Sequence, residues 1–405
     1  MTRTGKLTGA LGALSLMVAA TGVAEAQPLR IGALMPLTGD LQAYGESSRN
    51  GVQLAVKEIN AAGGVLGEPI ELQISDTQTE PQAGVDAAQR LVSVQGVHAI
   101  VGALSSGVTI PVASSVTSSE GVVQISNAST SPVITDLDDN DFLFRSVPSD
   151  AFQGTALAQV AMEEGVDSVG ILYINNDYGE GLADAFESAF ESQGGEVVGR
   201  SGYAPGQSSY RGELGQVSDG DAALLLIGYP ENGQTILRQA LEGGHFTEFV
   251  FTDGMKSPEI IENLGAQYLN GSFGTAAQAR DDTDAAQHFA SAYEAEYGEL
   301  PPVPYIDTAY DAVYTIALAA EAAGTTDPEL IRDHLREVAR PGGEPVGPGE
   351  FERARDLLSR GEDIDYQGAS GSINYDANGD VPGTFAHWAI QDGEIVTVKI
   401  FEPSM

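Results

Sequence analysis

Short apolar runs alternate along the chain with segments whose apolar residues recur at helical spacing. The segment Ser47–Ile59, for example, has apolar residues at Val52, Leu54, Ala55 and Ile59, which is typical of one helix face. A regular strand–helix–strand order of this kind predicts a parallel sheet covered by helices on both faces. In this first part of the chain we expect strands at Leu29–Met35, Ile70–Ile74, His98–Gly102 and Gly121–Ser126, and helices at Ser47–Ile59 and Pro81–Val92.

The same alternation starts again near residue 168, which predicts a second α/β unit. We therefore expect an α/β fold of two doubly wound, Rossmann-like lobes. Three further helices, a Pro/Gly-rich loop and late strands follow. The expected strands of the second unit are Ser168–Ile174, Glu196–Gly202, Ala222–Gly228 and Glu248–Thr252, and its helices are Glu180–Glu191, Tyr210–Val217 and Gly233–Glu242. The later segments are helices at Ala285–Tyr297, Ile306–Ala323 and Pro328–Val338, a loop at Pro341–Glu350, and strands at Ser372–Tyr375 and Glu394–Phe401.

The first 26 residues have the pattern of a secretory signal peptide. Arg3 and Lys6 precede an apolar run, and Ala24-Glu25-Ala26 fits a cleavage site after Ala26. The alternative is a membrane anchor, but the run is shorter than the roughly 20 apolar residues that a membrane span needs. We therefore expect export to the periplasm. The chain has no cysteine, so we expect no lipid anchor on an N-terminal cysteine and a freely diffusing protein.

The chain is strongly acidic, with a formal net charge of -39 at pH 7. Such a charge repels nucleic acids and anionic membrane surfaces, so neither is an expected partner. Because 42% of the residues are hydrophobic, the chain is not a disordered acidic segment.

The acidic residues are scattered along the chain, and we interpret them as a solvated surface suited to a saline environment. Added salt would screen their mutual repulsion in the folded state. We expect the melting temperature to rise as sodium chloride is increased from low to high concentration. A flat or falling melting temperature in that titration would contradict this interpretation.

Sequence motifs of the common catalytic and cofactor sites are missing. There is no phosphate-binding Gly-x4-Gly-Lys-Ser/Thr, no dinucleotide-binding Gly-x-Gly-x-x-Gly after the first strand, and no Gly-x-Ser-x-Gly turn. The five histidines are isolated, and Asp376–Asp380 is interpreted as a turn because a calcium loop would need a glutamate downstream. We therefore expect neither an enzyme nor a cofactor or metal, although two-domain α/β enzymes can lack a recognisable motif.

The mature chain resembles a known family closely. The segments Ile31–Gly39, Tyr44-Gly45, Asn50-Gly51 and Glu58–Gly67 carry the resemblance, and Asn176–Gly181 continues it. They are similar to the type I periplasmic binding proteins of the leucine/isoleucine/valine-binding group, which serve ABC importers. The resemblance extends through essentially the whole mature chain.

The resemblance implies two lobes joined by a hinge of several chain crossings, with a small amino-acid-like ligand held between them. It implies a monomer whose partners are the membrane permease subunits of an ABC importer. The first lobe would comprise residues 27–147 and about 277–355, and the second residues 148–276 and about 356–405. The segment Gly342–Gly371 departs from the shortest family members, and we expect it to belong to the docking surface or the hinge.

The resemblance also implies a binding site on specific residues. Ser106 matches the serine that binds the ligand carboxylate, and Asp253 matches the acid that pairs with the ligand ammonium, although the family usually has a glutamate there. The remaining positions contribute backbone groups, hydroxyls or bordering aromatic rings: Tyr44, Ser105, Ala128, Thr130, Tyr178 and Tyr229.

Independent physical arguments support the positions of the polar residues. Ser105 and Ser106 follow a predicted strand and precede a helix, where hydroxyls and free amides bind anions. Thr130 and Asp253 each follow a predicted strand, where ligands of open α/β sheets gather. Capping or packing is the alternative role for the serines, for Asp253, and for Tyr44 and Tyr178.

Three other functions remain open on sequence alone. The same clamp would serve a ligand-sensing receptor or regulator that transports nothing. A cleft enzyme would alter its ligand, whereas a binding protein would release it unchanged. An importer with this fold could also carry an amide, a urea-like compound or an aromatic acid.

Overall fold

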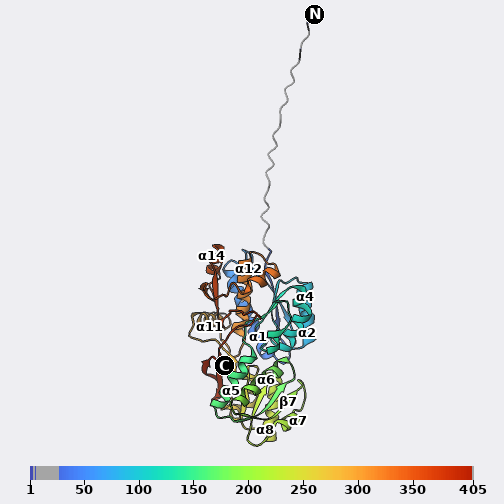
Figure 1. Cartoon of the computed structure of the whole chain (residues 1–405), viewed down its shortest axis with the longest axis vertical. Coiled ribbons are helices and arrows are strands. Elements are labelled where there is room, and N and C mark those ends of the chain that lie inside the picture. The colour runs from blue at the N-terminus through green and yellow to red at the C-terminus, as the bar shows by residue number, and fades with distance from the viewer. Residues whose placement is uncertain (3–4, 6–26, 404–405) are drawn as a thin grey trace.

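The computed structural model describes residues 1–2, 5 and 27–403, which form two lobes along the long axis of the molecule (Figure 1). The expected signal peptide and its cleavage site after Ala26 fall almost wholly outside these residues. Among the helices that the structure describes, none combines the length and the apolar character that a membrane span requires.

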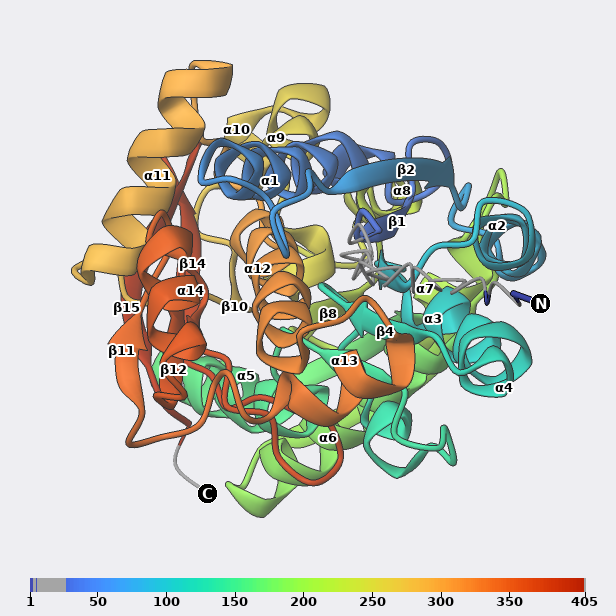
Figure 2. The same cartoon turned by 90° about the horizontal axis from the view of Figure 1, so that it is seen from above.

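The first lobe is built on a parallel sheet with the strand order β2-β1-β3-β4-β5. Two separate apolar cores lie on its two faces, because the strands are buried on both sides. Helices α2 and α3 cover one face, and α1 and α12 pack together over the other (Figure 2). The bounds are β1 (Arg30–Met35), β2 (Glu71–Asp76), β3 (Ala99–Gly102), β4 (Val123–Ser126), β5 (Leu143–Arg145), α1 (Gln42–Ala61), α2 (Pro81–Ser93), α3 (Ser106–Val112), α4 (Ser118–Glu120) and α12 (Ile306–Ala323).

The second lobe has the strand order β15-β14-β10-β9-β8-β6-β7. Strands β6 to β10 are parallel, whereas β14 and β15 add an antiparallel edge. The strands are β6 (Ser168–Ile174), β7 (Glu196–Tyr203), β8 (Ala223–Ile227), β9 (Phe249–Phe251), β10 (Phe273–Ala277), β14 (Phe385–Gln391) and β15 (Glu394–Phe401). The helices are α5 (Asp150–Glu163), α6 (Asp177–Ser192), α7 (Arg211–Val217), α8 (Pro230–Gly243), α9 (Pro258–Leu264) and α10 (Ala266–Leu269).

The late helices return to the first lobe together with a small third sheet, β11-β12-β13. In Figure 2, α11, α14, β11 and β12 gather on one side of α12. The expected loop at Pro341–Glu350 contains β11, which forms because it pairs in parallel with β12. The bounds are α11 (Asp284–Tyr297), α13 (Pro328–Leu335), α14 (Phe351–Ser359), β11 (Glu344–Val346), β12 (Ile364–Gly368) and β13 (Gly371–Ser372).

The described chain crosses between the lobes after β5, after β10 and after β13. The first and third crossings touch, because a Cβ added at Gly383 would lie 2.7 Å from Pro148. Glycine is therefore needed at position 383 to let the two segments pass this closely. The three crossings form the expected hinge.

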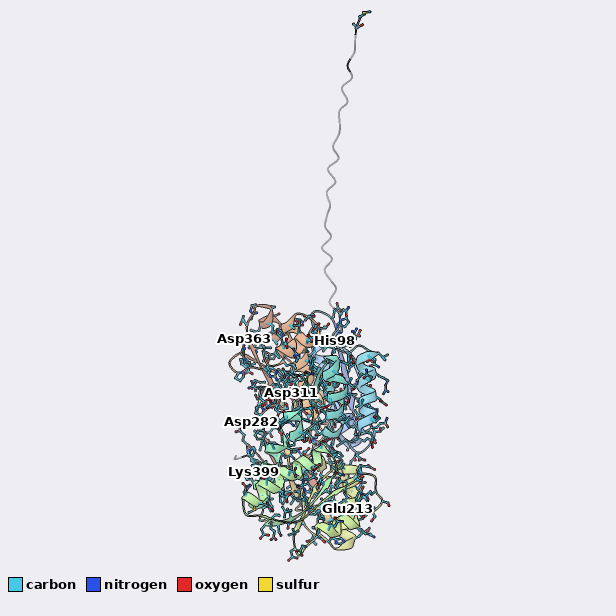
Figure 3. The ribbon with its side chains drawn as sticks, turned by 45° about the vertical axis from the view of Figure 1, so that its right-hand side comes forward. His98, Glu213, Asp282, Asp311, Asp363 and Lys399 are labelled. Carbon is cyan, nitrogen blue, oxygen red and sulfur yellow. The ribbon has the colours of Figure 1, made fainter. Side chains whose placement is uncertain are left out.

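The strand β12 and the two residues after it are attached to the first lobe through Asp311 of α12. The Asp311 carboxylate accepts hydrogen bonds from the Tyr366 hydroxyl at 2.7 Å and from the Ala369 and Ser370 amides at 2.9 and 2.7 Å. Burial raises the pKa of Asp311 to about 6. Figure 3 places Asp311 inside this lobe and Asp363 at its outer edge.

A lobe boundary near residue 356 would divide α14 and would separate β11 from its partner β12. We therefore propose that the second lobe resumes only after Ser372, with the first lobe comprising residues 27–147 and about 278–372. The segment Gly342–Gly371 then forms an extension of the first lobe beside the hinge.

Candidate functional site

The first lobe contributes its polar residues where β3 and β4 end. Ser105 lies just before α3 in an extended conformation, and Ser106 is the first residue of that helix. Ser126, the last residue of β4, accepts hydrogen bonds from the amides of Ala128 and Ser129 and donates one to the Ala103 carbonyl at 2.6 Å. These bonds fix the loop that carries Ala128 and Thr130, at the carboxyl edge where α/β sheets bind ligands.

The second lobe contributes residues from the equivalent edge of its own sheet. Tyr229 follows β8 and precedes α8, and Asp253 follows β9 in a 3-10 turn, Asp253–Met255. Tyr178, in the first turn of α6, stacks on Tyr229 with ring centroids 5.6 Å apart. The two aromatic rings and the carboxylate therefore form one wall.

Direct hydrogen bonds join the two lobes at this place. The Ser105 and Tyr229 hydroxyl oxygens lie 3.2 Å apart. The Tyr44 hydroxyl donates to the Gly254 carbonyl at 2.9 Å, and the Tyr305 hydroxyl donates to Asp253. The structure is therefore that of a closed clamp.

All of the site residues expected from the sequence are buried in this closed form. Ser106, Ala128 and Thr130 lie on the first-lobe wall of the site. There the Ser131 amide donates a hydrogen bond to the Ser106 hydroxyl at 3.2 Å and so joins the loop after β4 to the start of α3. Tyr178, Tyr229 and Asp253 lie on the second-lobe wall, which contacts the first lobe through the interlobe hydrogen bonds. The exposed fractions are 0% for Tyr44, 5% for Ser105, 2% for Ser106, 6% for Ala128, 1% for Thr130, 3% for Tyr178, 4% for Tyr229 and 2% for Asp253.

Asp253 is the focus of the hydrogen bonds in the second wall. Its carboxylate accepts from the Tyr178 hydroxyl at 2.9 Å, from the Gln153 amide at 2.7 Å, and from Tyr305. Burial raises the pKa of Asp253 above its ordinary value, and these donors offset part of that rise because they favour the ionised form. A carboxylate held in this way can receive a ligand cation without rearranging.

Asp150, Gln153 and Tyr305 belong to the same site, although sequence reasoning did not identify them. Asp150 and Gln153 are three residues apart at the start of α5 and share one helix face, which was a usable signal. The Thr130 hydroxyl lies 2.8 Å from a carboxylate oxygen of Asp150. Tyr305 has a left-handed backbone, with φ of 77°, just before α12, and nothing in the sequence predicts that its hydroxyl reaches the other lobe.

The structure also shows whether His, Asp and Glu side chains are arranged to bind a metal ion. Within residues 27–403, no cluster of three or more His, Asp or Glu side chains is arranged to hold a metal ion. The Asp376–Asp380 turn instead places Asp380 against Arg145 of β5, with Nε and Oδ1 2.6 Å apart.

Known proteins share both the sequence and the architecture of this chain. Residues 28–360 match the family model described as periplasmic binding protein. A Leu/Ile/Val-binding protein homolog of Brucella suis is 30% identical over 329 residues, which cover 80% of this chain and 86% of that protein.

A solved structure and a second relative extend the comparison. The branched-chain amino acid transporter substrate-binding protein LivJ of Streptococcus pneumoniae, in complex with isoleucine, is 26% identical with a TM-score of 0.78, over 93% of this chain and 100% of that chain. The chemotactic signal transduction system substrate-binding protein BasB of Halobacterium salinarum is 26% identical over 87% of this chain and 84% of that protein.

The match to the family model spans most of the chain, and the α/β fold of two lobes agrees with it. The chain therefore belongs to the type I periplasmic binding proteins of the Leu/Ile/Val-binding family, which are non-enzymatic substrate-binding proteins of ABC transporters.

Proposed function

We propose that this protein captures an amino acid of the branched-chain type by closing its two lobes and delivers it to the membrane permease subunits of an ABC importer. The observation that carries the proposal is the pairing of opposite walls. Hydroxyls and amides around Ser106 and Thr130 suit an anionic group, and Asp253 in the other lobe suits a cationic one. A zwitterion satisfies both walls at once.

In this mechanism the ligand carboxylate binds Ser106 and Thr130 in the first lobe. The ligand ammonium binds Asp253 and the Ala128 carbonyl, while Tyr229 approaches from the second lobe. Only the closed form brings all of these groups to the ligand, so binding shifts the hinge equilibrium towards closure. Ser105 supports the closed form by its hydrogen bond to Tyr229.

The proposal includes export, with cleavage after Ala26, and a monomer that diffuses in the periplasm. It takes no cofactor, because capture and release need no bond to be made or broken. The permease then distinguishes the closed from the open shape of the two lobes.

A thermal-shift screen tests the ligand class. The standard amino acids, small amides, urea and aromatic acids are added separately, and calorimetry follows on the compounds that raise the melting temperature. We expect leucine, isoleucine or valine to give the largest shift, since a ligand that binds only the native state stabilises it. A shift with only an amide, urea or an aromatic acid would replace this cargo with that one.

Replacement of Thr130 by alanine tests the carboxylate side of the site. We expect the dissociation constant for L-leucine to increase by about 5- to 150-fold, or roughly 1–3 kcal/mol, because a buried partner loses its hydrogen bond. Thr155→Ala, at a partly exposed position on α5, is the matched control and should bind as the wild type does. Unchanged affinity of Thr130→Ala in calorimetry would remove Thr130 from the site.

A second candidate function is ligand sensing with the same clamp. This candidate is supported by the similarity of the chain to a relative named for a chemotactic signal transduction system. Genetic linkage separates the two: neighbouring permease and ATPase genes would support import, whereas a neighbouring receptor gene without them would support sensing.

A further inference from the structure

Two buried carboxylates, Asp253 and Asp150, lie at the proposed binding site, and the proposed mechanism gives a role only to Asp253. Asp253 lies on the second wall, and Asp150 is the first residue of α5, directly after the first hinge crossing. Asp150 is 0% exposed. The Asp150 amide donates to the Thr130 carbonyl at 2.8 Å, so backbone and side chain both join Asp150 to Thr130.

The two carboxyl groups differ in the hydrogen-bond donors around them. Asp253 has the donors Tyr178, Tyr305 and Gln153. The Oδ2 atom of Asp150 has only the Thr130 hydroxyl, and its Oδ1 atom is buried without a partner. A buried negative charge needs such donors, so Asp253 is the better place for the charge and Asp150 for a proton.

The other groups around Asp150 do not reverse this assignment. Burial and the charge of Asp253 raise the pKa of Asp150 well above its ordinary value, while the Thr130 hydrogen bond and Arg145 lower it. The Arg145 guanidinium is already bound at two atoms by Asp380. Tyr178 of α6 is a neutral neighbour whose own pKa is raised by burial first and by both aspartates.

Asp253 and Arg145 are the charged groups that shift the pKa of Asp150. On α6, which packs against α5, Asp184 and Glu187 bind Arg200. On β14, His387 faces Glu164, just past the opposite end of α5. On β15, Lys399 binds Glu163 at that same end. The N-terminus of α5 favours an anion, but it does not supply a hydrogen bond to the Oδ1 atom of Asp150.

The state of Asp150 decides what the Thr130 hydroxyl can do, because that hydroxyl has a single proton. If Asp150 is ionised, Thr130 donates this proton to it and can only accept from a ligand. If Asp150 is protonated, it donates to Thr130 Oγ1 instead, and the Thr130 proton is available to an anion.

We propose that Asp150 carries a proton in the closed, ligand-bound protein and donates it to Thr130 Oγ1, which leaves the Thr130 hydroxyl free to donate to the ligand carboxylate. Asp150 is then a positioning residue that acts through Thr130. The proposal rests on the proposed function, since it assumes a ligand with a carboxylate at Thr130. It predicts that ligand binding and protonation of Asp150 favour each other.

Calorimetry of L-leucine binding between about pH 5 and pH 9 tests this linkage. In the wild type the dissociation constant should be level at the acid end. It should then rise, by up to about tenfold per pH unit, above the pKa of Asp150 in the free protein. Asp150→Asn supplies an amide N–H to the same Thr130 oxygen, so we expect it to bind like the protonated wild type and to lose this rise.

The decisive quantity is the ratio of the dissociation constant of Asp150→Asn to that of the wild type. The leucine ammonium and the buried Lys256, whose pKa is lowered by burial to about 8, also titrate towards the basic end, and they affect both proteins equally. A ratio that is constant over the whole pH range would overturn the proposal, as would a large loss of affinity in Asp150→Asn at the acid end. Asp282→Asn, at an exposed carboxylate whose partner is Arg280, is the control and should follow the wild type.

Infrared spectroscopy of the protein alone separates failure of this proposal from failure of the proposed function. At the acid end of the calorimetric pH range we expect a protonated-carboxyl band in the wild type that is missing from Asp150→Asn. If no branched-chain amino acid binds but the band is present, the ligand class is wrong and the assignment of the proton stands. If the band is absent from the wild type, the proposal is overturned whatever binds.

Discussion

Replacement of Asp253 by asparagine is expected to weaken the binding of L-leucine by roughly thirtyfold to several thousandfold, or about 2–5 kcal/mol. The variant keeps the shape of the side chain but removes the negative charge that the ligand ammonium would meet in a buried site. It also replaces one carboxylate oxygen by an NH2 group, which then meets a donor of the wild-type site: either the Tyr305 hydroxyl at Oδ2, or the Tyr178 hydroxyl and the Gln153 amide at Oδ1. Both changes act on the closed, ligand-bound form.

Titration calorimetry measures the effect, and circular dichroism verifies that the variant is folded. Asp282→Asn serves as the control, because it makes the same substitution at an exposed position. A folded Asp253→Asn variant with the wild-type dissociation constant for leucine would exclude Asp253 from the ammonium site.

The second large effect concerns folding, at the buried ion pair between Arg145 of β5 and Asp380. Arg145 has a side chain that is 0% exposed, and it binds Asp380 with Nε–Oδ1 at 2.6 Å and Nη2–Oδ2 at 2.8 Å. We expect Asp380→Ala to lower the free energy of unfolding by about 3–5 kcal/mol, because it leaves a buried guanidinium without its counter-charge.

Urea unfolding followed by circular dichroism measures this loss. The matched control is Asp282→Ala, which breaks an exposed ion pair with Arg280 and should leave the unfolding midpoint almost unchanged. If the midpoint of Asp380→Ala equals that of the control, the ion pair does not hold this turn in place.

Much of the fold could be predicted from the alternation of apolar runs and amphipathic segments. The strands Ser168–Ile174 and Glu394–Phe401 have the expected bounds, and the first two strands differ by one or two residues. Hydrophobic periodicity is a strong signal for such elements because burial follows it directly.

Other elements depend on partners that are distant in sequence. The strand β14 pairs with β10, which precedes the second crossing, and its long buried run Phe385–Ile390 has no alternation to mark it as a strand. The short strand β11 contains a proline and exists only because β12 lies beside it.

The candidate site could be predicted only in part. Strand ends identify where Ser106, Thr130 and Asp253 gather, because parallel strands place their carboxyl ends at one edge. The roles of Asp150 and Tyr305 depend on closure, which brings residues of two lobes within hydrogen-bond distance. Such a contact has no local pattern in the sequence.

In the proposed mechanism, one ligand bridges the hydroxyls of the first lobe and the carboxylate of the second. A crystal structure of the protein grown with L-leucine is the decisive test of this bridge. We expect electron density between the closed lobes, with the leucine carboxylate hydrogen-bonded to Ser106 and Thr130 and its ammonium to Asp253. Leucine bound anywhere else, or bound in the cleft with its two charged groups exchanged, would contradict it.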